Sequence, residues 1–138
     1  MIKQNALPSD ISGRLELLKP LFEKESRAVF AYIFGGLASG RQHPLSDVDI
    51  AVYLDSDVNN VEAKLDIIGA LSDALKTDEI DLVVLNHAPI SLVGRVLMKK
   101  KIITDKRPFL RHSFESLALR EFFDFSRKEK DILFRRFT

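Results

Sequence analysis

Two aspartates, Asp47 and Asp49, are separated by a single residue at the start of an apolar run. On a β-strand, side chains two positions apart point to the same face, so these carboxylates would lie side by side, with Cα atoms about 6–7 Å apart. Carboxylates this close repel each other unless a cation lies between them. Mg²⁺ prefers oxygen ligands and is usually bound by carboxylates together with substrate phosphates. The pair predicts a Mg²⁺ and phosphate site, unless the aspartates are merely solvated or cap a turn.

A third aspartate, Asp81, lies in a later apolar run and would also occupy a strand. If that strand neighbours the one carrying Asp47 and Asp49, three carboxylates converge. Such a cluster could hold two metal ions about 3.5–4 Å apart, a geometry suited to in-line phosphoryl displacement. We therefore expect Asp47, Asp49 and Asp81 to be both the metal ligands and the catalytic residues.

A glycine pair, Gly35 and Gly36, follows the apolar run that precedes the aspartates. Glycine lets backbone amides approach a ligand closely, because it adopts positive φ without penalty. Amides exposed at a turn that enters a helix bind anions, and the hydroxyl of Ser46 could add a further donor. The alternative is an ordinary turn, since Gly-Gly is a common loop dipeptide.

The elements that would position these residues follow from apolar periodicity. The predicted helices are Ser9–Glu25 (kinked or broken at Pro20), Val58–Lys76, Pro89–Lys99 and Ser113–Arg136, the predicted strands are Ala28–Gly35, Asp47–Leu54 and Glu79–Asn86, and residues 101–105 form a short strand or an extended link. Within the second strand, Asp47, Asp49, Ala51 and Tyr53 share one face. This order predicts an α/β (α+β) domain, with a small mixed sheet flanked by helices.

Composition limits the classes of partner. The chain of 138 residues carries a net charge of +1, so no global field draws it to nucleic acid or to a membrane surface. It has no cysteine and no apolar stretch of bilayer length, and because its first residues form no long apolar run we expect no signal peptide. We expect a cytoplasmic protein with neither a membrane nor a nucleic-acid partner.

The glycines and aspartates together match a known signature. Its pattern is G-[GS]-x₃-G-x₅-S-D-x-D, and the matching residues are Gly35, Gly36, Gly40, Ser46, Asp47 and Asp49. The strand around Asp81 matches the third acidic position. The chain thus resembles the DNA polymerase β-like nucleotidyltransferases, and more narrowly the minimal nucleotidyltransferases of prokaryotes. The resemblance implies one domain, 1–138, with a catalytic core at about 26–88 and a helical C-terminal segment at about 89–138.

The resemblance implies transfer of a nucleoside monophosphate, most simply AMP from ATP, to a hydroxyl with release of pyrophosphate. Asp47 and Asp49 would hold the metal and NTP, and Asp81 would be the third acid. The residues expected at the triphosphate are Gly35, Gly36, Gly40 and Ser46. Minimal members are often encoded beside a HEPN-domain toxin and act as its antitoxin, some by AMPylating the toxin on tyrosine. ATP or another NTP and a HEPN toxin are therefore the expected partners.

Two positions depart from this family. Many minimal members have serine at the position of Gly36, and arginine is common at the position of Ser39, with Arg41 two residues later as a substitute charge. These departures motivate an alternative, an inactive or weak member that neutralises its partner by binding alone. A small-molecule acceptor such as an aminoglycoside is a third possibility, although so short a chain leaves little material for its pocket.

The C-terminal half contains two further patterns. A basic run from Lys99 to Arg111 would be either a solvated rim or a surface for triphosphate, RNA or an acidic partner. The last helix carries two apolar faces, one through Phe114, Leu117, Ala118, Phe122, Phe125, Ile132 and Leu133 and one through Leu119, Phe123, Phe134 and Phe137. Either a partner chain or homo-oligomer covers the second face, or the helix breaks and packs both faces internally.

Overall fold

The computed structural model describes residues 11–38 and 47–137. The helical elements are α1 (Ile11–Arg14), the 3₁₀ turn η1 (Leu15–Leu17), α2 (Leu18–Lys24), α3 (Gly35–Ala38), α4 (Asn60–Leu75), the 3₁₀ turn η2 (Leu85–His87), α5 (Ile90–Met98) and α6 (Pro108–Phe137). The strands are β1 (Ala28–Phe34), β2 (Val48–Leu54), β3 (Ile80–Val84) and β4 (Lys101–Asp105). The segment 101–105, left open between strand and link, is therefore a strand.

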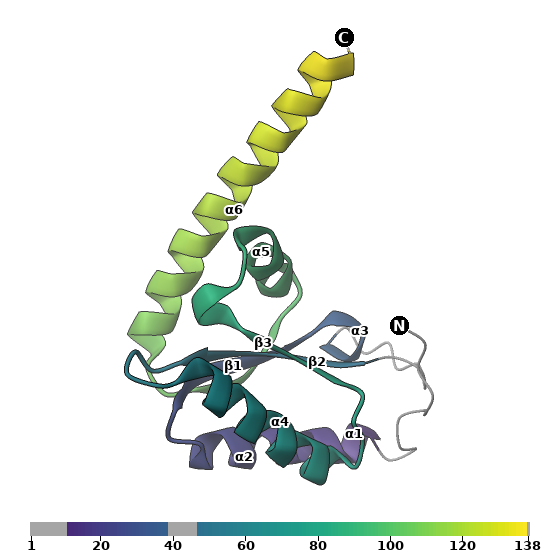
Figure 1. Cartoon of the computed structure of the whole chain (residues 1–138), viewed down its shortest axis with the longest axis vertical. Coiled ribbons are helices and arrows are strands. Elements are labelled where there is room, and N and C mark those ends of the chain that lie inside the picture. Colours follow the sequence, from purple (N-terminus) through teal and green to yellow (C-terminus); the bar gives the residue numbers. More distant parts are fainter. Residues whose placement is uncertain (1–10, 39–46, 138) are drawn as a thin grey trace.

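The strands form one mixed sheet in the order β3-β2-β1-β4. β1 runs antiparallel to both β2 and β4, whereas β2 and β3 are parallel. Helices α2 and α4 cover one face of the sheet, and α5 and α6 lie on the other (Figure 1). The predicted small mixed sheet flanked by helices is confirmed.

Strand β2 builds both faces of this sheet through its alternation. Its residues Val48, Ile50, Val52 and Leu54 are completely buried in the core beneath α2 and α4. Ala51 and Tyr53 belong to the second core, which α5 and α6 cover. The face assignment made from the sequence is confirmed for the residues of β2, and it places Asp49 on the α5 and α6 side. Asp47 precedes the strand, so its predicted face is not tested.

The first helix is interrupted as its proline predicts. Pro20 has no N–H to donate to the carbonyl of Glu16, and its ring crowds that carbonyl. Glu16 lies in η1, where the helix tightens to a 3₁₀ turn before α2 begins at Leu18. The predicted end at Glu25 is also close, since α2 ends at Lys24.

The third strand is shorter than expected. β3 ends at Val84, and the chain turns through η2. The reason is Asn86, whose side chain accepts a hydrogen bond from the Leu54 N–H (2.9 Å) and donates one to the Leu54 C=O (2.8 Å). A side chain thus takes the place of backbone pairing at the end of β2.

The last helix is continuous, so the alternative of a broken helix that packs both faces internally is wrong. α6 begins at Pro108, earlier than the predicted Ser113, because proline is well suited to a first helical position. Phe122 packs directly on Gly94 of α5, where any added Cβ would collide with its ring. Beyond this contact α6 extends past the rest of the fold (Figure 1), and the side chains of Phe123, Ile132 and Phe134 are at least half exposed.

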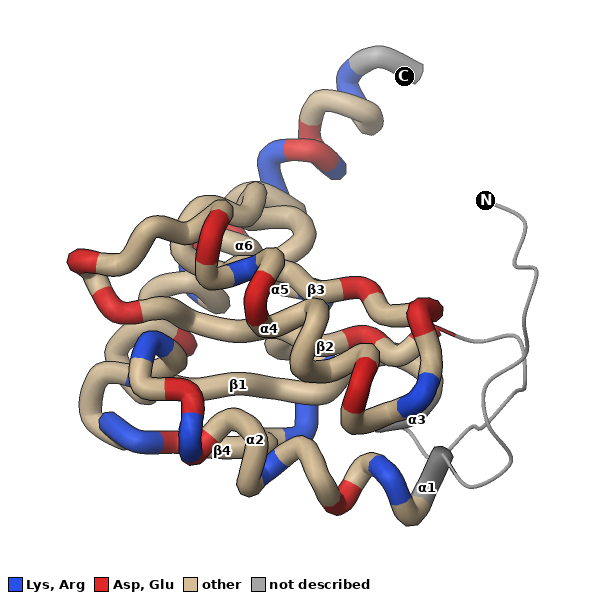
Figure 2. The backbone as a smooth tube through the Cα atoms, turned by 60° about the horizontal axis from the view of Figure 1, so that its bottom comes forward, with Lys and Arg blue, Asp and Glu red and all other residues tan. Residues whose placement is uncertain are grey.

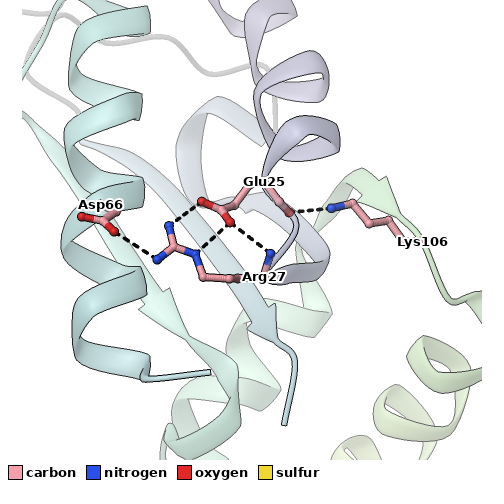
Figure 3. Close-up of polar contacts among 4 residues, drawn as sticks. All are labelled: Glu25, Arg27, Asp66 and Lys106. Carbon is pink, nitrogen blue, oxygen red and sulfur yellow. Dashed lines mark hydrogen bonds and ion pairs between the residues drawn. The ribbon is translucent and has the colours of Figure 1, made fainter. Parts of the chain in front are cut away.

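An ion-pair cluster joins the elements at one end of the sheet (Figure 3). Arg27 donates to both carboxylate oxygens of Glu25 (2.9 and 2.7 Å) and to Asp66 of α4 (3.0 Å). Lys106 donates to the backbone carbonyl of Glu25 (2.6 Å). The cluster ties α2, β1, α4 and the end of β4 together, away from the aspartates at the start of β2.

Candidate active site

The sheet register brings two of the three predicted acidic residues together. β2 and β3 are parallel neighbours, and Asp49 lies directly opposite Asp81. Directly paired residues in a sheet point to the same face, so both carboxylates project towards the α5 and α6 side. The condition stated from the sequence, that the strand of Asp81 neighbours the strand of Asp49, is confirmed.

The third aspartate lies immediately before β2. Asp47 and Asp49 are half-buried, whereas Asp81 is exposed. Figure 2 shows acidic positions of adjoining segments gathered at the end of the sheet next to α3. Phe34, the last residue of β1, pairs with Asp49, and the glycine turn follows Phe34 directly. The turn therefore lies at the same end of the sheet as Asp49.

The glycine turn lies directly beside Asp49. Gly35 has φ +75°, a conformation that glycine adopts far more readily than other residues, and it begins the short helix α3. A Cβ added at Gly35 would collide with the carboxylate of Asp49. Gly36 follows inside α3, so the predicted turn into a helix is present. Gly40 and Ser46 lie outside the described residues, and their phosphate-binding roles stay a prediction.

The metal prediction can be tested against the donor set. Within residues 11–38 and 47–137, no group of three or more His, Asp or Glu side chains is placed to hold a metal ion, so the expected convergence of three carboxylates is not seen. Mg²⁺ commonly takes only one or two protein carboxylates and completes its shell with substrate phosphates and water. The neighbouring Asp49 and Asp81 offer the two carboxylates that such an ion takes, and the binding of Mg²⁺ with a nucleotide stays a prediction.

A polar network lies on the same face of the sheet, between β1, β4 and α6. The Tyr32 hydroxyl donates to Glu115 (2.6 Å), and Arg111 bridges Glu115 (2.9 Å) and Asp105 (2.7 Å). Burial tends to raise the pKa of Glu115, but the hydrogen bonds from Tyr32 and Arg111 outweigh it and hold this pKa below its usual value. Burial is the main cause of the raised pKa of the Tyr32 hydroxyl, so this hydroxyl stays protonated and can donate a hydrogen bond.

The basic run predicted as a rim or an anion surface is largely engaged within the fold. Arg111 is buried in the network above, and Lys100 pairs with Glu115 (3.3 Å). Arg107 pairs with Asp55 (3.1 Å). The run mainly holds β4 and α6 against the sheet. Sequence alone could not show the pair of Arg107 with Asp55, because the two residues are 52 positions apart.

A groove that the sequence did not predict runs beside Asp81. It is a cavity of about 360 Å³ lined by residues 81–84 of β3, by Lys64 of α4, and by His87, Pro89 and Leu92 on the other side. β3 is an edge strand, so its open side forms the floor and the two helical layers form the walls. The sequence could not predict this groove, because the groove depends on the position of β3 at the edge of the sheet.

The fold and the site define a class of protein. The profile of the family "Polymerase beta, Nucleotidyltransferase" matches residues 16–108, and the chain belongs to this family. None of the helices in the described ranges has both the length and the apolar character needed to cross a membrane.

Individual relatives are more specific. Protein adenylyltransferase MntA of Shewanella oneidensis is 33% identical over 86 residues, which make up 62% of this chain and 60% of that relative. Among solved structures, a variant of the toxin–antitoxin pair MntA-HpeT superposes with a TM-score of 0.71 at 22% identity, over 91% of this chain and 98% of that one. A tri-AMPylated Shewanella oneidensis HEPN toxin in complex with MNT antitoxin superposes with a TM-score of 0.68 at 19% identity, over 93% and 99%. These superpositions show the shared fold.

Proposed function

We propose that this protein transfers AMP from ATP to a hydroxyl of a HEPN-domain toxin and thereby acts as its antitoxin. The observation that carries the proposal is the register that sets Asp49 opposite Asp81, beside the glycine turn. Family membership supports nucleotidyl transfer as the reaction class. The relative named a protein adenylyltransferase, and the AMPylated HEPN toxin among the similar folds, support AMP and a toxin acceptor.

In the proposed reaction the acceptor oxygen attacks the α-phosphorus of ATP. A new O–P bond forms as the bond between the α-phosphorus and its bridging oxygen breaks, and pyrophosphate leaves. Asp81, the exposed carboxylate, takes the proton of the acceptor hydroxyl. Asp47 and Asp49 would hold Mg²⁺, which supplies charge stabilisation at the phosphates when bound. The glycine turn orients the triphosphate through backbone amides at Gly35 and Gly36.

Intact-mass spectrometry tests this proposal. The protein is incubated with ATP, Mg²⁺ and any HEPN-domain protein encoded next to its gene. We expect the HEPN protein to gain the mass of one or more AMP groups, and we expect a chelator to abolish the gain. Parallel reactions with the other three NTPs identify the preferred nucleotide. An unmodified HEPN protein under all these conditions would refute the transferase assignment.

A second candidate function is neutralisation by binding alone. The observation that favours it is the far part of α6, where Phe123, Ile132 and Phe134 are at least half exposed. Polar substitution of Phe123 and Phe134 would then weaken complex formation, and Asp49→Asn would leave neutralisation intact. Under the transferase proposal, Asp49→Asn abolishes modification even where the complex persists.

A further inference from the structure

The groove beside Asp81 has the geometry of a strand-binding site. Four consecutive residues, 81–84, line it, and consecutive strand residues share one cavity only where the cavity opens on the edge of the strand. Among the described strands, β3 pairs with β2 alone. Lys64 on α4 and His87 and Leu92 on the opposite wall flank this edge on its two sides.

The backbone direction of β3 follows from its pairing. The Val48 N–H of β2 donates to the Glu79 carbonyl (2.9 Å), and Val48 lies opposite Ile80. Backbone groups of successive strand residues alternate in direction, so those of Asp81 and Val83 point to β2. The N–H and C=O groups of Leu82 and the N–H of Val84 therefore point into the groove, whereas the Val84 carbonyl, at the N-cap of η2, accepts the first hydrogen bond of that turn. Ile80, the other outward residue, already donates its N–H to Asp78 (2.9 Å).

These outward groups indicate the chemistry of the occupant. Alternating donors and acceptors at strand spacing are matched by another extended polypeptide, which adds to an open sheet edge through main-chain hydrogen bonds. A sugar, an aminoglycoside or a nucleic-acid backbone lacks this repeat. A peptide strand laid here would also pass the exposed carboxylate of Asp81, which is the first of the groove-lining residues of β3.

We propose that an extended segment of the acceptor protein binds as a fifth strand on the edge of β3 that no described strand occupies, and so presents its hydroxyl to Asp81. The inference rests on the proposed function and adds the acceptor site to it. The hydroxyl loses its proton to Asp81, its oxygen bonds to the α-phosphorus, and pyrophosphate departs. Main-chain pairing fixes the position of the segment, and the walls of the groove select its side chains.

The absence of cysteine from the chain allows a direct test. Lys64→Cys places a single thiol on the groove wall. Asp73→Cys, nine positions further along α4 and also exposed, places one on the opposite side of the same helix. Each thiol is coupled to a bulky polyethylene glycol maleimide. AMP transfer to the co-encoded HEPN protein and affinity for Mg²⁺-ATP are then measured for both.

We expect coupling at Lys64→Cys to slow transfer by about tenfold or more, because the blocked acceptor can no longer be aligned. ATP affinity should stay within about twofold, and the coupled Asp73→Cys variant should resemble the unmodified protein. Equal transfer by the two coupled variants would overturn the proposed groove.

A second measurement separates failure of the groove from failure of the proposed function. An environment-sensitive fluorophore replaces the polymer at each thiol, and the HEPN protein is added. A spectral shift at position 64 but not at 73 supports docking in the groove, even if the unmodified protein transfers no AMP and the proposed function fails. No shift at position 64 overturns the groove, whatever the outcome of the transfer assay.

Discussion

The two faces of the sheet differ in composition although the same strands build both. The face beneath α2 and α4 is closed by apolar side chains, and every core residue that β2 contributes there is fully buried. The face beneath α5 and α6 carries Asp49 and Asp81 at one end and a hydrogen-bonded network around Glu115 towards β4.

Because of this difference, adjacent residues of β2 contribute to stability on one face of the sheet and to the proposed chemistry on the other. Ile50 contributes apolar burial, and its neighbour Asp49 presents a charge that costs free energy to desolvate unless it is compensated. Substitutions on one face should therefore change stability, and substitutions on the other should change transfer. The network is the exception, because it is polar and yet holds α6 in place.

Removing the central charge of the network should have the largest effect on stability. Arg111→Met leaves the largely buried carboxylate of Asp105 without this partner and Glu115 with one donor fewer. Breaking a buried pair in this way costs about 3–5 kcal/mol. Chemical denaturation measures the change, and a loss below about 1 kcal/mol would mean that the network contributes little.

The closed apolar face should respond almost as strongly. Ile50→Ala removes a fully buried side chain from the core, which destabilises proteins by about 2–5 kcal/mol. Transfer per folded molecule should remain within about threefold, because the substitution touches no group of the site. Urea unfolding and a rate normalised to the folded fraction test the two halves of this prediction. A specific loss of transfer would show that the faces are coupled.

The contact between α5 and α6 offers an intermediate effect. In Gly94→Ala the new methyl group collides with the ring of Phe122, and overpacking of this kind costs about 1–3 kcal/mol. Thermal unfolding should report the loss. A matched substitution, Gly69→Ala, lies on α4 where a Cβ meets nothing nearby and should not destabilise the protein. Similar melting temperatures for the two variants would contradict the packing described for α6.

The smallest effect expected is a pH-dependent one at Tyr32. Tyr32→Phe removes a donor to Glu115 and should cost on the order of 1.5 kcal/mol at neutral pH. The pKa of Glu115 is lowered in the fold, so its stabilising contribution is present above its usual value of about 4.5 and is lost as the pH falls through the folded pKa. The difference between wild type and variant should therefore shrink from pH 7 towards pH 3. A gap that does not change with pH would exclude this carboxylate as the cause.

Local patterns in the sequence predicted much of the fold. The alternation of β2 gave the correct faces, and Pro20 marked the break in the first helix. What could not be predicted depends on strand order and on contacts between distant residues. The residues around Lys64 in the sequence do not indicate that it lines a groove together with Asp81. Likewise, the residues around Tyr32 do not predict its hydrogen bond to Glu115, which is 83 positions away.

The most direct test compares Asp49→Asn with Ile50→Ala, two adjacent residues on opposite faces of β2. Both variants and the wild type are given α-labelled ATP, Mg²⁺ and the HEPN partner, and label on the partner is followed with time. For Asp49→Asn the proposed site predicts that the rate of transfer falls about 10³-fold or more, while the free energy of unfolding stays that of the wild type. For Ile50→Ala it predicts a nearly unchanged rate of transfer per folded molecule. Transfer by Asp49→Asn at the wild-type rate would contradict the assignment of this face as the site of nucleotidyl transfer.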